Sequence, residues 1–292
     1  GVIDIKGDLN ALNINLQTQI AGNAIPNSNI HFTAVAASNA HNKRFELQKL
    51  LIETLGGQVS TQGLLTFSEY INWQGQSTIS HIDPSVFWPA LKADINGEIN
   101  TQANNSQGVW QANLQQLDIN GQWQGYPLSA SGNVDFHENN GLNLQHLTLK
   151  NANNELTVDG SLTKQQALDI NFKLDTPDIA NTLPQVSGAI NLTGSLTGSI
   201  EQPELIYTLS ASELLVSGIF IEQAAGKGQL KWNKQKPVDL SLNLSGIQGV
   251  SNQVDNAQLV LNGDASDHKL SLTTNGPSTN VEISIQGQLN ES

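Results

Sequence analysis

Cysteine and methionine are both absent from this 292-residue sequence, and charged residues make up only 13% of it. Without cysteine the chain can hold neither a disulfide framework nor a thiolate metal site, and the absence fits an extracytoplasmic compartment that does not rely on disulfides. Lysine and arginine total 13 against 26 acidic residues, so the formal net charge is −13. Nucleic acids and anionic membrane surfaces are bound by clustered basic residues, and neither is therefore an expected partner.

Long apolar runs are also missing. No stretch approaches the roughly 18 apolar residues that a membrane-spanning helix needs, and no secretory signal peptide is present. The first residue, Gly1, is followed at once by the strand-like segment Val2 to Lys6. We therefore expect a piece of a longer chain, with any targeting or anchoring segments outside it.

The residues that are present alternate between apolar and polar, most clearly from Val186 to Ile200. A period of two is typical of a β-strand with one apolar and one polar face. Fifteen extended residues would span roughly 50 Å, far more than a usual strand, so we expect bends. Glycines on the apolar face allow bulges, corners and close approach of another backbone. The apolar or glycine positions are Val186, Gly188, Ile190, Leu192, Gly194, Leu196, Gly198 and Ile200.

The same short pattern recurs along the chain, with an apolar residue at alternate positions and a glycine in the fifth place. The irregular spacing of these glycines excludes a solenoid of fixed period. It predicts many similar strands joined by loops of unequal length, in a curved sheet whose concave side is apolar. The copies run from Ile3 to Leu9, Leu117 to Trp123, Leu128 to Val134, Leu156 to Leu162, Ile190 to Leu196 and Ile283 to Leu289.

Three segments are less regular than the rest. Arg44 to Leu55 suits a helix face or a strand, and we favour a strand because both neighbours are strands. Asp83 to Leu91 predicts a short helix, with Asp83 as its cap and Pro84 in its first position. A second short helix is expected from Pro177 to Leu183. The fold class predicted is therefore all-β, with one or two very short helices.

No group of residues has the spacing of a catalytic or metal site. The six histidines, His31, His41, His81, His137, His146 and His268, are isolated from one another and lack cysteine partners. Carboxylates are spread along the polar faces rather than clustered as sugar cleavage or calcium binding requires. We expect no enzymatic activity, no metal and no cofactor.

The segment from Asp178 to Ile221, with its Gly198 to Pro203 turn, resembles the C-terminal part of the TamB family of AsmA-like bridge proteins. The earlier stretch QVSTQGLLTF, followed by Asn72-Trp73 and Asp83-Pro84, is similar to the same family further upstream. The resemblance implies an elongated sheet folded into a U-shaped trough, a β-taco, in the periplasm of a Gram-negative bacterium. Residues 1–292 would form one continuous segment of it, with a sub-boundary near residues 92–94.

The resemblance also implies a function. Such a segment would conduct phospholipids from the inner to the outer membrane along its apolar groove, and would aid outer-membrane protein assembly with a TamA-type barrel. The full-length chain would be anchored in the inner membrane, and it would reach both membranes and the barrel through segments outside these residues.

Two alternatives remain beside the conduit: a structural periplasmic spacer, or a β-helix adhesin, each with a dry closed core. A β-helix would show a fixed coil period, which the sequence lacks. The spacer differs from the conduit only in whether the apolar face is open to lipid. If it is, alternation predicts that the groove is lined by Ile3, Ile5, Leu117, Ile119, Leu156, Val158, Leu168, Ile170, Phe172, Ile190, Leu192, Leu196, Ile200, Leu240, Leu242, Leu244, Leu259, Leu261, Ile283 and Ile285.

Overall fold

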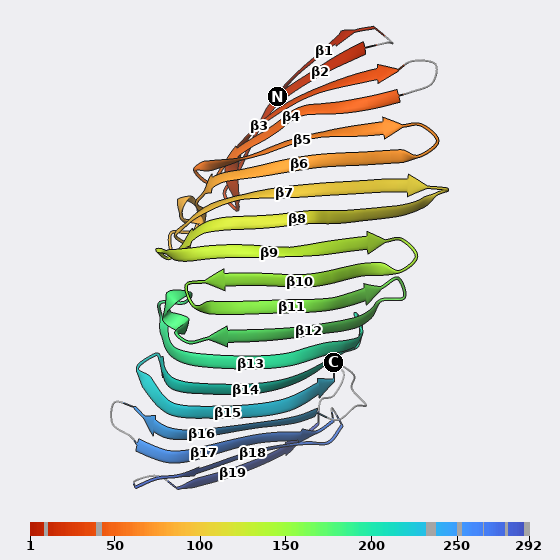
Figure 1. The fold of residues 1–292 in the computed structure, drawn as a ribbon. Helices are drawn as coiled ribbons and strands as arrows, with labels where there is room; N and C mark the ends of the chain where they lie inside the picture. The colour runs from red at the N-terminus through yellow and green to blue at the C-terminus, as the bar shows by residue number, and fades with distance from the viewer. Residues whose placement is uncertain are drawn as a thin grey trace. The chain divides into compact units, whose positions relative to one another are not determined.

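The computed structural model of the chain describes residues 1–8, 11–38, 43–231, 238–249, 253–264, 266–277 and 280–288. These residues form nineteen β-strands and two single turns of 3-10 helix (Figure 1), which confirms the all-β prediction. Neither turn is long enough to cross a membrane. The chain divides into two compact units, unit 1 at residues 1–151 and unit 2 at residues 152–292. The single continuous segment and the sub-boundary near residues 92–94 stay predictions.

Unit 1 is an antiparallel meander in which each strand pairs with the next one along the chain. The first 3-10 turn, η1, interrupts it between the sixth and seventh strands. The elements are β1 (Val2–Gly7), β2 (Ala11–Gly22), β3 (Ile25–Ser38), β4 (Lys43–Thr54), β5 (Gly57–Phe67), β6 (Ile71–Ile82), η1 (Pro84–Val86), β7 (Ala93–Ser106), β8 (Val109–Trp123), β9 (Tyr126–His137) and β10 (Gly141–Asn151).

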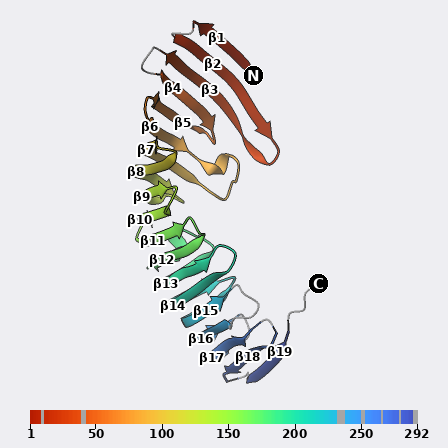
Figure 2. The same ribbon diagram turned by 90° about the vertical axis from the view of Figure 1, so that its right-hand side faces the viewer.

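Unit 2 repeats this plan, again with antiparallel neighbours in chain order (Figure 2). Its 3-10 turn, η2, follows the second strand of the unit. The elements are β11 (Asn154–Thr163), β12 (Ala167–Thr176), η2 (Ile179–Asn181), β13 (Val186–Ser199), β14 (Pro203–Val216), β15 (Ile219–Lys231), β16 (Val238–Gln248), β17 (Gln253–Gly263), β18 (His268–Asn275) and β19 (Val281–Gly287).

Antiparallel pairing excludes the β-helix, whose successive coils pair in parallel, so that alternative was wrong. Several hairpins close through two residues with positive φ, as at Leu55-Gly56 (51° and 75°) and Ser217-Gly218 (52° and 80°). Turns of this kind match the right-handed twist of the strands that they join, and glycine takes the second position without strain. Local turn chemistry therefore sets the order of the meander.

The ambiguous segment from Arg44 to Leu55 is strand β4, as expected. Both short helices are also present, each shortened to one 3-10 turn. The Asp83 carboxylate accepts the Ser85 N–H at 3.0 Å and the Ala93 N–H at 3.1 Å, and so ties η1 to the start of β7. In η2, Asp178 caps in the same way, and the buried Asn154 amide donates to the Asp178 carbonyl and the Thr182 hydroxyl.

Bends in the strands coincide with shifts of register between paired strands. Eight such shifts occur among the described residues, seven of them in unit 1. The eighth lies between Ser187 and Ala189, beside Gly188, where a bulge was expected. Gly194 differs from that expectation, because it keeps regular register with both Phe172 and Tyr207. Its role is packing, described below.

A second layer over the sheet is missing from both units. Within each unit the described elements make extensive contact only with their neighbours in the sheet, apart from η2 against β13. Burial agrees: only five apolar side chains among the described residues are buried, namely Ala34, Leu47, Ala93, Ile179 and Ala224. Each sheet is open, and its apolar side chains are shielded only by one another.

Candidate functional site

One line of residues crosses all nine strands of unit 2, and we call it the central apolar row. Residues directly opposite in an antiparallel pair carry their side chains on the same face, so the register identifies the row. At about 4.8 Å between strands, the row is roughly 40 Å long. It consists of Leu156, Leu174, Leu192, Leu209, Gly226, Leu242, Leu259, Leu272 and Ile283.

A second row runs beside it, two residues along each strand, and is apolar, aromatic or glycine throughout. Both rows therefore belong to one apolar face of unit 2. This second row is Val158, Phe172, Gly194, Tyr207, Gly228, Leu240, Leu261, Leu270 and Ile285.

The opposite face of unit 2 is mainly polar. Residues one position along each strand from the central apolar row lie on this face. Apart from Val260, the row next to the central apolar row carries only hydroxyl and lysine side chains, and Ile206, opposite Ser195, is a further apolar side chain on this face. That polar row is Thr157, Lys173, Thr193, Thr208, Lys227, Ser241, Val260, Ser271 and Ser284.

Unit 1 has a comparable row with a polar interruption. Thr61 and Ser77 lie opposite each other in it, and their hydroxyl oxygens are 2.8 Å apart, so the two groups satisfy one another. The interruption therefore leaves no unpaired hydroxyl on the face. The row is Ile3, Leu16, Phe32, Leu50, Thr61, Ser77, Ile99, Leu117 and Gly132.

Glycines on the apolar face make room for large side chains from neighbouring strands. A Cβ at Gly194 would lie 2.5 Å from Cζ of Phe172 and 2.5 Å from the carbonyl oxygen of Ile206. The Trp73 indole likewise occupies the space above Gly63 and Gly75, and its Nε1–H donates to the Thr101 hydroxyl at 3.0 Å. Aromatic rings thus cover the backbone where a side chain is missing, a pairing known to support strands that contain glycine.

The structure brings most of the predicted groove residues together. Five of them lie in the central apolar row, namely Leu156, Leu192, Leu242, Leu259 and Ile283. Ten more lie an even number of residues from that row on strands of unit 2. In unit 1, Ile3 and Leu117 lie in the row described above. Ile5 and Ile119 lie two residues further along the same strands, and therefore on the same face. The ten are Val158, Leu168, Ile170, Phe172, Ile190, Leu196, Leu240, Leu244, Leu261 and Ile285.

Ile200 is the exception among the predicted residues. Strand β13 ends at Ser199, and Ile200 follows in a bend where its N–H donates to the Gln166 carbonyl at 3.1 Å. Its side chain is 52% exposed and is not part of a cross-strand row. The alternating pattern runs one residue beyond the strand, so its last member does not share the face.

Four residues of the central apolar row are not among the groove residues predicted from the sequence. Leu174, Leu209, Gly226 and Leu272 complete the central apolar row from strands β12, β14, β15 and β18. Strand alternation in LIYTLSAS and HKLSLTTN contains the needed signal. Trp73 was noticed only as part of a motif. Gly75 lies two residues away on the same strand, but the contact with Gly63 on β5 depends on register, which a single strand does not reveal.

An apolar pocket of about 880 Å³ opens at one end of strands β2 to β5, and we call it the end pocket. Phe45 lies on its floor, and its ring stacks on Phe32 with 6.3 Å between ring centroids. Lys43 lies directly opposite Phe67, which is 38% exposed. The lining consists of Gly7, Asp8, Leu12, Ala36, Ala37, Ser38, Lys43, Arg44, Phe45, Leu65 and Phe67.

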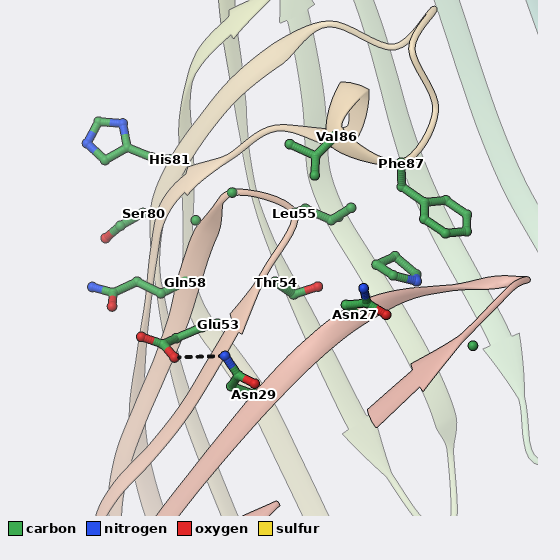
Figure 3. A pocket seen from close by; sticks show the side chains of 14 residues that line it. Asn27, Asn29, Glu53, Thr54, Leu55, Gln58, Ser80, His81, Val86 and Phe87 are labelled. Atoms are coloured by element: carbon green, nitrogen blue, oxygen red, sulfur yellow. Dashed lines mark hydrogen bonds between the residues drawn. The ribbon is translucent and has the colours of Figure 1, made fainter. Parts of the chain in front are cut away.

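A second pocket of unit 1, about 720 Å³, lies where η1 meets the hairpin between β4 and β5 (Figure 3). Figure 3 shows Val86 and Leu55 close together, with Glu53, Gln58 and His81 away from them. Asn29 donates to Glu53 at 3.5 Å. Amide and carboxylate groups dominate this pocket, so it does not continue the apolar face.

Two observations describe the titratable groups near these faces. Within the described ranges no group of three or more histidine, aspartate or glutamate side chains is arranged to hold a metal ion, and His41 falls outside those ranges. The hydroxyl and backbone N–H of Ser85, with the Ala93 N–H, hold the pKa of Asp83 below its usual value. That carboxylate is a structural cap and lies away from the apolar rows.

Comparison with known proteins gives a consistent assignment. A family model described as the TamB N-terminal domain matches residues 1–292. The translocation and assembly module subunit TamB of Haemophilus influenzae (strain ATCC 51907 / DSM 11121 / KW20 / Rd) is 26% identical over 293 residues. That alignment covers 98% of this chain but 22% of the relative, so the chain spans about a fifth of the relative's length. No solved structure is significantly similar to the chain.

One part of the predicted resemblance needs correction. The motifs suggested the C-terminal part of the family, whereas the matching model is that of the N-terminal domain. Strand patterns of this kind recur along a long sheet, so they identify the family better than the position within it. Because the N-terminal domain model matches the whole of residues 1–292, the chain belongs to the TamB family.

Proposed function

We propose that the apolar face conducts phospholipids, whose acyl chains lie across the strands while their headgroups stay in water. The central apolar row carries this proposal, since it crosses nine strands without a polar side chain. A sheet that is apolar on one face must bury that face, and the described elements include no second layer that covers it. Acyl chains supply the missing cover, at roughly 0.8 kcal/mol per buried methylene.

Movement along the face follows from its uniformity. Each step from one strand to the next exchanges leucine, isoleucine or aromatic contacts for similar ones. The free energy of a bound chain therefore changes little along the row, and no position needs to be a specific site.

The setting of this activity is part of the proposal. The sheet of the whole protein is folded into a U-shaped β-taco with its apolar face concave, and it crosses the periplasm between the inner and outer membranes. Anchoring in the inner membrane, and work with a TamA-type barrel in outer-membrane protein assembly, belong to segments outside these residues. The relative's name, a translocation and assembly module subunit, supports that partnership.

The test is to purify the chain from a Gram-negative host, extract it with organic solvent and identify lipids by mass spectrometry. We expect phospholipid to copurify. Leu192→Asp, in the central apolar row, should lower the amount, whereas Thr193→Asp on the opposite face should not. A folded chain that carries no phospholipid in any of the three forms would contradict the proposal and favour a structural spacer.

A further inference from the structure

The end pocket of unit 1 combines an apolar floor with a basic edge. Leu12, Phe45 and Leu65 supply apolar side chains from three strands. At the edge stand Lys43 and Arg44, where β4 begins. They are the only two consecutive basic residues in the sequence, and Arg44 is its only arginine.

The two cations are available for a ligand. Both side chains are exposed, and no ion pair or hydrogen bond of either is found among the described residues. Asp8 also lines the pocket, and its carboxylate accepts the N–H of Ala11 at 3.1 Å. Two positive charges thus face one carboxylate that already has a hydrogen-bond partner.

Strand alternation distinguishes the two cations. Lys43 has the same parity as Phe45 and lies opposite Phe67, so its ammonium stands on the apolar face. Arg44 lies opposite Thr66 and also borders a polar concavity with Glu46. It therefore belongs to the opposite face of β4 and reaches the pocket only at its edge. Lys43 is therefore better placed to contact a group whose apolar part occupies the pocket.

We propose that the end pocket holds the phosphate end of an anionic phospholipid, with Lys43 on the phosphate, Arg44 as a second contact and acyl chains over Phe45, Leu65 and Phe67. The inference deepens the proposed function, because it gives one fixed point for the headgroup on a face that otherwise lacks specific sites. A volume of about 880 Å³ lies within the range of small-ligand pockets, roughly 300–1,000 Å³. Charge complementarity selects a phosphate diester over an uncharged lipid.

The experiment uses two soluble probes with the same acyl chains, dihexanoyl phosphatidylglycerol and uncharged dihexanoylglycerol, and measures affinity by titration of the whole chain. Lys43→Gln should weaken the phosphatidylglycerol affinity severalfold, and Lys43→Gln with Arg44→Gln about tenfold or more. Arg44→Gln alone should weaken the phosphatidylglycerol affinity less than Lys43→Gln does. Lys49→Gln is the matched control, since it removes one exposed charge from the same strand outside the pocket.

Three further measurements separate the contribution of the phosphate group from that of the acyl chains. Dihexanoylglycerol should bind wild type and Lys43→Gln equally, and Phe67→Ala should weaken both probes. Inorganic phosphate should bind far more weakly than phosphatidylglycerol, and equal affinity would show that the apolar floor contributes nothing, against the inference. Circular dichroism melting confirms that each exposed-site variant is folded.

The two proposals fail in different ways. If phosphatidylglycerol binds and depends on Leu192 but is insensitive to Lys43 and Arg44, only the headgroup site is wrong. If neither probe binds wild type, the proposed function fails, and the headgroup site fails with it. Equal losses for Lys43→Gln and Lys49→Gln would show general electrostatic attraction and would overturn the site.

Discussion

At the scale of single residues, alternation along a strand decides which neighbours a side chain meets. Leu192 is half-buried between Leu174 and Leu209, whereas Thr193, one position along, is exposed between Lys173 and Thr208. Because side chains alternate across a strand, one position decides whether a residue meets apolar neighbours or water. Substitutions can therefore be paired with a control on the adjacent residue.

The open face predicts a mild cost for Leu192→Asp. In a closed core, a buried carboxylate would cost several kcal/mol unless it were neutralised. Here water reaches the face, so we expect the free energy of unfolding to fall by about 1–3 kcal/mol, chiefly through lost leucine packing. Chemical denaturation followed by circular dichroism measures this difference. Thr193→Asp should change it little, and collapse of the Leu192→Asp fold would indicate a dry, closed core.

Asp83 predicts a dependence on pH. Its folded-state pKa is lowered by hydrogen bonds from Ser85 and Ala93, so its stabilising effect is complete above the unfolded-state value and is lost as pH falls through the folded value. Asp83→Ala should thus lower the melting temperature at neutral pH. The gap between wild type and variant should shrink below about pH 4, the usual range of an aspartate. A gap that stayed constant into strong acid would mean that the charge of Asp83 is not involved.

At the scale of the element, much of the structure follows from alternation and turn residues. Alternation predicts that Leu168, Ile170 and Phe172 share one face, as they do in β12, and the Asp-Pro pair predicts η1 at its first residue. Pairing partners are harder to predict, because register depends on two strands at once. The aromatic cover over Gly63 and Gly194 could not be derived for that reason. The end pocket was likewise missed, since its lining comes from five strands, β1 to β5, joined only by register.

Glycine packing gives a prediction at this scale. Gly194→Ala would place a methyl group 2.5 Å from Phe172 and from the Ile206 carbonyl oxygen, so both the ring and the backbone must move. At Gly226 the nearest atoms, from Leu242 and Ser241, are 3.3 Å away, and a small adjustment suffices. We expect Gly194→Ala to lower the free energy of unfolding by about 1–3 kcal/mol and Gly226→Ala by less. Equal stabilities of the two variants in thermal melts would refute the packing role assigned to Phe172.

At the scale of the whole molecule, each unit is a single-layered antiparallel meander with one apolar face. A free-standing sheet of this kind leaves large side chains exposed, such as Ile5 in unit 1 and Ile285 in unit 2. Isolated exposed side chains are ordinary on protein surfaces, but a contiguous apolar face indicates a binding surface. The chain belongs to the TamB family, and its Haemophilus influenzae relative is named a translocation and assembly module subunit. The lipid on the face is the part that remains a proposal.

Site-specific photo-crosslinking in growing cells tests that proposal most directly. A photoreactive residue at Ile190, Leu192 or Leu196 should capture phospholipid, whereas one at Asn191 or Thr193 should not. The same contrast should hold for Leu240, Leu242 and Leu244 against Asn243, for Ile283 and Ile285 against Ser284, and for Leu117 and Ile119 against Asp118 in unit 1. The account predicts phospholipid adducts on one face only, in every strand sampled. Equal adducts at adjacent positions, or none on the apolar face, would contradict it.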